Sequence, residues 1–258
     1  MNRKYRYFIF GDVHGEHFSM VSSLQDAGWD PNNPKHILIS LGDNFDRGSE
    51  NVKVYEFLNK YSVLNIFGNH ESLLYEYLIG RSNGMFDCEH NGMLWTIEEF
   101  AGKRPILSHT VSDLFALRYE IINRHPELLK WLETIPNGYK IGNYILTHAG
   151  FENRYMIKDY NDTMWFPNEW TKSPKFVLNY KNTQDFKFIF GHWHAWRLTK
   201  EFMGIEDGKS HTFDYQNFIG LDAYTNITKR VNVYVIDSDH KAIPFAKSWN
   251  METIKSLN

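Results

Sequence analysis

Five short motifs in this sequence place metal-binding side chains directly after apolar runs. In order along the chain they are GDVHG (residues 11–15), GDNFDRG (42–48), GNHE (68–71), HAG (148–150) and GHWH (191–194). Their carboxylates, imidazoles and amide offer hard oxygen and borderline nitrogen donors. Such a donor set suits Mn, Fe or Zn ions. The motifs therefore predict a metal centre.

The residue types also suit a pair of ions. Asp12 and His14 are one residue apart, and a turning backbone leaves their side chains on the same side. A carboxylate such as that of Asp43 can bridge two cations. Two cations roughly 3.5–4 Å apart can share a hydroxide and clamp a phosphoryl group, because water between them loses a proton near neutral pH. The predicted chemistry is hydrolysis of a phosphate ester.

Each motif alone has an ordinary structural explanation. A Gly-Asp pair is usually a turn, and a single His is usually a core or surface residue. The chain has 12 His, so some are expected behind strands by chance. Chance does not account for all five motifs in order, each behind an apolar run. The histidines that lack this context are expected to be structural: His17, His36, His90, His109, His125, His211 and His240.

The apolar runs before the motifs are predicted to be strands. These runs, rich in aromatic and β-branched residues, are Tyr5–Phe10, His36–Leu41, Ser62–Phe67, Tyr144–Thr147 and Phe186–Phe190, with a further strand at Val231–Ile236. Helices are predicted at Glu16–Trp29, Ser49–Tyr61 and Glu71–Ile79. This alternation favours parallel βαβ units. Ligands of such sheets bind at the carboxyl ends of the strands, so we expect the motifs to meet at one rim.

Residues 81–136 interrupt this alternation. Helical patterns cover Val111–Ile122 and Pro126–Ile135, and Pro136 follows the second one directly. We interpret the stretch as a helical insertion that flanks the sheet. No linker rich in Pro, Gly or Ser separates two units, so we expect a single domain over residues 1–258.

The composition argues against several classes of function. The formal net charge is −3, from 28 Lys and Arg against 31 Asp and Glu, so no nucleic-acid partner is expected. No segment approaches the ~20 apolar residues that span a bilayer, so no membrane partner is expected either. Cys88 is the only cysteine, which excludes an intrachain disulfide and suits a reducing, cytoplasmic compartment. We expect its thiol to be structural.

The ordered motifs resemble those of the calcineurin-like metallophosphoesterases. DRG and GNHE are most similar to the serine/threonine phosphoprotein phosphatase branch, and GDNFDRGSENVKVYEFL resembles its small bacteriophage-lambda type. PELLKWLETIP resembles the helix before the later histidine strand of that type. The resemblance extends to about residue 195. It implies an α/β fold in which two central mixed sheets are flanked by helices, an α-β-β-α sandwich.

The resemblance also implies a role for each matched residue. The metal ligands would be Asp12 and His14 for the first ion, Asn69, His148 and His192 for the second, and Asp43 as the bridge. His70 would protonate the leaving alkoxide, Asp46 would orient His70, and Arg47 would grip phosphate oxygens. Two divalent ions are implied, with Mn²⁺ expected and Fe, Zn or Ni as alternatives.

One departure from the family pattern concerns phosphate binding. Phage-type relatives carry a second phosphate-binding arginine in a W-x-R pattern. The similar stretch here is MWFP (residues 164–167), so Pro167 stands at the expected arginine position. Arg154, Lys172 and Arg197 are the candidates to replace that arginine.

The other departure is His194. It makes GHWH similar to the GHxH motif of the wider metallophosphoesterase group, in which the last His is also a metal ligand. His194 is therefore either a ligand of the first metal or a polar rim residue beside the indoles of Trp193 and Trp196.

The leading hypothesis is a phosphomonoesterase whose substrates are phosphorylated proteins, at phosphoserine or phosphothreonine, or small phosphate esters. The alternative is a nucleotide hydrolase, for example of diadenosine polyphosphates. The missing arginine favours it, as do tryptophans that could stack on bases, although core packing is the simpler explanation for any one of them: Trp165, Trp170, Trp193 and Trp196.

Two further classes fit less well. A nuclease would need a basic groove. A non-catalytic binding module on a decayed phosphatase scaffold would be expected to have lost ligands, and every ligand position is filled. The sequence leaves the natural substrate, the metal pair and the oligomeric state open.

Overall fold

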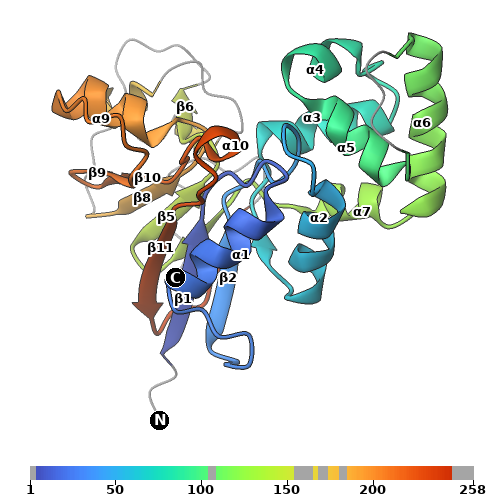
Figure 1. The fold of residues 1–258 in the computed structure, drawn as a ribbon. Coiled ribbons are helices and arrows are strands. Elements are labelled where there is room, and N and C mark those ends of the chain that lie inside the picture. The colour runs from blue at the N-terminus through green and yellow to red at the C-terminus, as the bar shows by residue number, and fades with distance from the viewer. Residues whose placement is uncertain (1–3, 104–108, 154–164, 168–173, 180–184, 246–258) are drawn as a thin grey trace.

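Two mixed β-sheets packed face to face form the centre of the structure, a computed structural model that describes residues 4–103, 109–153, 165–167, 174–179 and 185–245 (Figure 1). Helices cover the outer faces of both sheets. The predicted α/β fold, with two central mixed sheets flanked by helices, is confirmed.

The first sheet carries the N-terminal motifs. Its strand order is β11 (Val233–Ser238), β1 (Tyr5–Phe10), β2 (His36–Ser40) and β3 (Leu64–Asn65). Strands β1, β2 and β3 are parallel, and β11 runs antiparallel to β1. The three parallel strands therefore end at the same edge of the sheet.

The second sheet carries the two later histidine motifs. Its order is β12 (Ile243–Pro244), β4 (Gly138–Ile141), β5 (Tyr144–Thr147), β8 (Lys187–Phe190), β10 (Phe218–Gly220) and β9 (Phe213–Tyr215). Strands β5, β8 and β10 are parallel and also end together. A separate pair joins β6 (Phe151–Asn153) to β7 (Trp165–Pro167).

Helices follow the first three strands, as the alternating pattern predicts. They are α1 (His17–Asp26), α2 (Asn51–Lys60) and α3 (Asn69–Leu78). Between residues 81 and 136 lie α4 (Met85–His90), α5 (Met93–Phe100), α6 (Val111–Arg124) and α7 (Leu128–Thr134). The later helices are α8 (Phe176–Asn179), α9 (Ala195–Met203) and α10 (Thr225–Thr228).

The helices between residues 81 and 136 pack against α2 and α3, on the side of the molecule away from α9 (Figure 1). Ile97 of α5 and Leu114 of α6 belong to one core cluster with Phe45 and Leu74. The single-domain organisation stays a prediction. None of the described helices is long and apolar enough to cross a membrane.

The strands next to the centre are buried on both faces over most of their length, which explains why apolar residues dominate their sequences. In β1, Tyr7 and Ile9 pack between the two sheets, whereas Phe8 and Phe10 pack under the helices. In β8, Ile189 takes the position between the sheets. The buried part of each of these strands lies directly before its motif, so the predicted motifs start where the buried strands end.

Element boundaries differ from the predictions in informative places. Strand β3 has only two residues, although the N–H of Ile66 still donates to Ser40 O at 2.9 Å; the N–H of Phe67 then turns to Pro136 O at 2.9 Å. Helix α3 starts two residues before the predicted Glu71, which places Asn69 and His70 in its first turn. The strand predicted from Val231 starts at Val233 and runs to Ser238. Short elements without a strong pattern were not predicted: β4, β6, β7, β9, β10, β12, α4, α5, α8, α9 and α10.

Candidate metal centre

The two sheets meet at the rim where their parallel strands end. His148, directly after β5, donates its Nδ1–H to the carbonyl of Leu41, just beyond β2, at 2.8 Å. The backbone N–H of His192, after β8, donates to both oxygens of Asp12, after β1, at 3.1 and 3.0 Å. These contacts bring the predicted motifs of both halves of the chain to one place, as the strand order requires.

The backbone at this rim is held in unfavourable conformations. Ten described non-glycine residues have a positive φ, and five of them are predicted site residues: His14, Asp43, Asp46, Arg47 and His192. A left-handed conformation costs a non-glycine residue of order 1–3 kcal/mol and persists only where the surroundings enforce it. Such strain concentrates at functional sites, so this observation supports the site independently of residue type.

Two groups of side chains that could hold a metal ion share Asp43. The ligand atoms of His14, Asp43 and His70 lie within 4.8 Å of one another, as do those of Asp43, His148 and His192. All except His192 are buried. The shared carboxylate is the arrangement expected of a bridge between two ions. The first group contains His70 where the family resemblance places Asp12.

Hydrogen bonds fix the orientation of the imidazoles. A carbonyl can only accept, so Nδ1 of His14 donates to Phe45 O at 3.0 Å and Nδ1 of His148 donates to Leu41 O at 2.8 Å. The Nε2 atom of each ring then faces the other residues of the rim and is the atom that could bind a metal. Metal-binding histidines are usually held in this way by a partner on the other nitrogen. The rings are therefore oriented as a metal site requires.

Asn69 completes the second group. Its Oδ1 atom lies 3.0 Å from Nε2 of His148 and 2.8 Å from Nδ1 of His192. The backbone N–H of His70, in the first turn of α3, donates to Asp43 Oδ1 at 2.9 Å. The amide oxygen and the bridging carboxylate thus converge with two imidazoles at the N-terminus of α3.

Asp12 is buried against the loop after β8. Its carboxylate touches Gly191, where an added Cβ would lie 2.2 Å from Oδ1. Burial, together with the nearby charge of Asp222, raises the pKa of Asp12 well above its usual range. Buried carboxylates whose charges reach each other need a proton or a cation to compensate them. A divalent ion would supply that charge.

The electrostatics of the rim also fit a metal. Burial lowers the pKa of His14 to about 3, with Arg47 adding to the effect, and burial lowers that of His192 to about 4, so both rings are neutral, the form that can bind a metal. Burial lowers the pKa of His148 too, but the charge of Asp43 raises it to about 10. A proton on His148 thus balances Asp43, and a bound cation would take its place. The donor set fits divalent metals.

A His–Asp pair and an arginine lie beside the two ligand groups. His70 Nδ1 is 2.6 Å from Asp46 Oδ2, and its Nε2 is 3.8 Å from Asp43 Oδ2. Burial lowers the pKa of His70, but Asp43 and Asp46 raise it above its ordinary value. Arg47 donates from Nη1 to His14 Nε2 at 2.9 Å, and its Nη2 lies 3.2 Å from His70 Nε2. All three predicted residues therefore face the centre.

His194 lies at the edge of the site and belongs to neither ligand group. Its Nδ1 bonds to Asp222 Oδ2 at 2.9 Å, and its ring packs on Tyr224 with centroids 4.1 Å apart. Asp222 is 1% exposed, and its charge reaches Asp12 and His14. The bond to Asp222 holds His194 at the rim. Whether His194 is also a metal ligand stays a prediction.

Two buried acids of the rim were not singled out from the sequence. Asp222 follows β10, which ends at Gly220 beside β8, so the same strand-end pattern holds there. Glu71 accepts from the backbone N–H groups of Asp43, Asn44 and Gly68 at 2.8, 2.9 and 3.0 Å. Glu71 thus joins the GDNFDRG and GNHE loops. Its place inside the GNHE motif is the sequence feature from which a role at the rim could have been predicted.

Only one of the three candidates for the missing arginine lies among the described residues. Pro167 ends β7, and Arg154 and Lys172 lie outside the described residues. Arg197 is exposed on α9, and its guanidinium lies 5.2 Å from the ring centroid of Trp196. Among the described candidates, none takes the place of that arginine.

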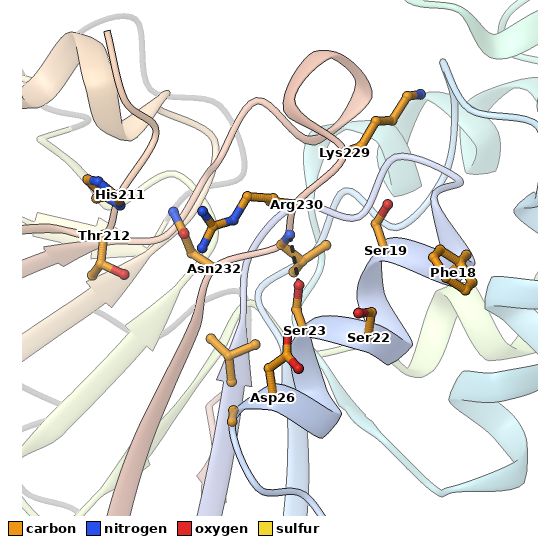
Figure 2. Close-up of a pocket in the computed structure, with 13 residues that line it drawn as sticks. Phe18, Ser19, Ser22, Ser23, Asp26, His211, Thr212, Lys229, Arg230 and Asn232 are labelled. Carbon is orange, nitrogen blue, oxygen red and sulfur yellow. Dashed lines mark hydrogen bonds between the residues drawn. The ribbon is translucent and has the colours of Figure 1, made fainter. Parts of the chain in front are cut away.

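A surface cavity of about 650 Å³ lies between α1 and the start of β11 (Figure 2). Polar side chains of α1 form one wall, and Arg230, Asn232 and His211 lie opposite them. None of the predicted site residues is among the described residues that line it. The candidate centre is therefore the strand-end rim and not this cavity.

Replacing Asp43 tests the shared bridge. We expect Asp43→Asn to weaken binding of both ions, because the amide removes the charge that both groups share. The loss should exceed the ~10–100-fold typical of residues that only orient a ligand. Metal content after dialysis against buffered Mn²⁺ measures it. Asp237→Asn, which removes the exposed partner of Arg6, is the control. Equal metal content in Asp43→Asn and wild type would remove Asp43 from the centre.

Replacing Glu71 tests the brace between the loops. Glu71→Gln keeps the shape but turns an NH₂ group toward backbone donors, so we expect a loss of about 2–4 kcal/mol in the free energy of unfolding. Urea unfolding of metal-free protein measures it. Glu76→Gln on the same helix, which loses only an exposed contact with Arg81, should stay within about 0.5 kcal/mol. Equal effects of the two changes would contradict the brace.

Comparisons with known proteins agree with this geometry. The sequence profile of the calcineurin-like phosphoesterases matches residues 5–196. The chain is 38% identical over 193 residues to serine/threonine-protein phosphatase 2 of Escherichia coli (strain K12), which covers 72% of this chain and 78% of that protein. It is 27% identical over 158 residues to the asymmetrical bis(5'-nucleosyl)-tetraphosphatase PrpE of Geobacillus sp. (strain WCH70), covering 57% and 58%.

A solved structure gives the same fold. A protein provisionally described as a diadenosine tetraphosphatase superposes with a TM-score of 0.54 over 93% of both chains, at 16% identity. At this identity the likeness concerns the fold alone. The family profile, by contrast, covers most of the chain and includes all five motifs, the last of which is GHWH at residues 191–194. The chain therefore belongs to the calcineurin-like phosphoesterase family of hydrolases.

Proposed function

We propose that this protein is a dinuclear metal-dependent phosphomonoesterase that hydrolyses phosphoserine, phosphothreonine and small phosphate esters. The observation that carries the proposal is the pair of ligand groups that share Asp43, with Arg47 and the His70–Asp46 pair beside them. Metal ligands, a phosphate-binding cation and a proton donor are the parts that phosphate ester hydrolysis requires.

The proposed ligands keep the family's assignment. Asp12 and His14 would hold one ion, Asn69, His148 and His192 the other, and Asp43 both, with His194 as a candidate addition to the first. Mn²⁺ is the proposed metal, since mixed oxygen and imidazole donors suit it, and Fe, Zn or Ni are the alternatives. When bound, the two ions would polarise the phosphoryl oxygens and lower the pKa of a shared water.

The remaining residues would act on the substrate. Arg47 has a planar guanidinium that can bind two phosphate oxygens at once. It is half-buried and lies between His14 and His70, so a phosphate placed there would face the ligand group that these two histidines form with Asp43. His70, protonated on Nε2, would give that proton to the leaving oxygen, while Asp46 holds Nδ1–H.

The proposed substrate class rests on the resemblance to protein phosphatases. The 38% identical relative is named a serine/threonine-protein phosphatase, and its alignment covers 78% of that protein. An alkoxide from serine or threonine is a poor leaving group, so a positioned imidazolium speeds its departure. The buried His70–Asp46 pair suits that demand.

A nucleotide hydrolase is the second candidate. The relatives named bis(5'-nucleosyl)-tetraphosphatase favour it, including one from Bacillus subtilis (strain 168) that is 34% identical over 124 residues. Pro167 at the expected arginine position and the indole of Trp193, 5.1 Å from the His192 ring centroid, also favour it. Both candidates use the same metal centre and differ in what lies around it.

The proposed setting is the cytoplasm, and the proposed partners are phosphate ester substrates. Burial raises the pKa of Cys88 to about 12, so its thiol is unreactive at neutral pH. An unreactive single cysteine is compatible with a reducing compartment.

Replacing His70 tests the proton donor. We expect His70→Asn to keep its metals but lower kcat by ~10²–10⁴ on substrates with poor leaving groups, the range of a positioned acid. The loss should be small on 4-nitrophenyl phosphate, whose leaving group needs no proton. Steady-state kinetics with both substrates and metal analysis measure this. An equal loss on good and poor leaving groups would contradict the role.

A comparison of substrates tests the function itself. Chelator-stripped protein with Mn²⁺ added back is assayed on a phosphoserine peptide, 4-nitrophenyl phosphate and diadenosine tetraphosphate. We expect Mn²⁺-dependent release of phosphate from the peptide and from 4-nitrophenyl phosphate. Preference for the dinucleotide would establish the second candidate instead. Turnover of none of them, with metals bound, would refute both.

A further inference from the structure

The side chain of Thr96 on α5 contacts Asp46 at two points. Its hydroxyl donates to Asp46 Oδ1 at 2.5 Å and accepts from the backbone N–H of Asp46 at 2.9 Å. Thr96 is 0% exposed, so these bonds form in the protein interior without competing water. The two residues are 50 positions apart in the sequence, so the helices between residues 81 and 136 bring them together.

The same helix holds the neighbouring residue as well. Gly92, at the start of α5, accepts from the backbone N–H of Arg47 at 3.1 Å. A Cβ at Gly92 would lie 2.8 Å from that nitrogen, so only glycine allows this approach. Asp46 and Arg47 have φ of 72° and 68°, and such strained conformations need enforcing contacts. One edge of α5 supplies them.

The hydroxyl of Thr96 does more than satisfy a buried amide. The N–H of Asp46 also donates to Asn51 Oδ1 at 2.8 Å, so it has a partner without Thr96. What Thr96 adds is the bond to Oδ1. The two oxygens of a carboxylate share one plane, so holding Oδ1 sets the direction of Oδ2. That second oxygen is 2.6 Å from Nδ1 of His70.

We propose that Thr96 is a positioning residue for the His70–Asp46 pair, through which the helices of residues 81–136 set proton delivery to the leaving group. This rests on the proposed function. In that step the Nε2–H bond of the His70 imidazolium breaks and an O–H bond forms on the leaving oxygen. Neutral His70 then keeps its Nδ1–H on Asp46. The hydroxyl of Thr96 bonds to Asp46, so Thr96 acts through the orientation of that carboxylate.

Three substitutions test the proposal. Thr96→Val keeps the side-chain shape and removes the hydroxyl, whereas Thr96→Ser keeps the hydroxyl. Thr110→Val is the matched control, because Thr110 caps α6 in the same helical region, where its hydroxyl accepts from Asp113 N at 3.2 Å. If Thr96→Val does not fold, Thr96→Ala replaces it. Kinetics are measured on Mn²⁺-loaded full-length protein and NMR spectra on the same proteins loaded with diamagnetic Zn²⁺, because Mn²⁺ would broaden nearby proton signals, with metal content recorded.

The kinetic readout is the dependence on the leaving group. We expect Thr96→Val to lower kcat on a phosphoserine peptide by roughly 10–100-fold, the scale of a misplaced reacting group. The KM for the peptide and turnover of 4-nitrophenyl phosphate should change little. Thr96→Ser should restore peptide turnover, and Thr110→Val should lower only the melting temperature. Equal losses on both substrates, or an unchanged kcat, would overturn the proposal.

A spectroscopic readout separates this proposal from the proposed function. The Nδ1 proton of His70 in a short bond to a carboxylate should resonate far downfield in the proton NMR spectrum, and His70→Asn identifies it by loss of the signal. Thr96→Val should shift or broaden this resonance, and Thr110→Val should not. An unchanged resonance would overturn the positioning role, even if the wild-type protein hydrolysed none of the substrates tested.

Discussion

A buried carboxylate surrounded by imidazoles is the constraint around which this rim is organised. Asp43 lies 3.3 Å from Nε2 of His148 and accepts from the N–H of His70, and the imidazoles hold its pKa well below the usual range despite burial. A charge placed there without partners would destabilise the fold. The strand ends of both sheets, the start of α3 and the brace from Glu71 all converge on it. The chemistry and the packing therefore depend on one residue.

Much of this arrangement could be predicted from the sequence, because each motif follows a strand buried on both faces. The buried ends of these strands are apolar, at Tyr7–Phe10 and Ile145–Leu146, and the motif residues Asp12 and His148 follow within two positions. Parallel strand order then places those ends together. The same logic applies to Asp222, but β10 has only three residues and leaves too short a pattern to recognise.

Contacts made across long sequence separations could not be predicted. Nothing in the sequence around Thr96 distinguishes it from other threonines on an apolar helix, since its partner is 50 residues away. The location of His194 was also open, because GHWH does not say whether the ring turns toward the metal ligands or toward Asp222. Side-chain direction at a rim depends on neighbours that only the folded chain supplies.

The link between Asp12 and His192 has a consequence for how the chain folds. The two residues are 180 positions apart, and His148 meets Leu41 across 107 positions. Contacts between residues so far apart in the sequence form slowly, because the chain must lose the entropy of a large loop before such a contact contributes stability. The pairings of β1 with β2 and β3, and of β4 with β5 and β8, join segments that are closer in the sequence, whereas the centre exists only once both sheets are joined. The candidate metal site is thus expected to form late in folding, and ion binding would stabilise the contact between two sheets that have already formed.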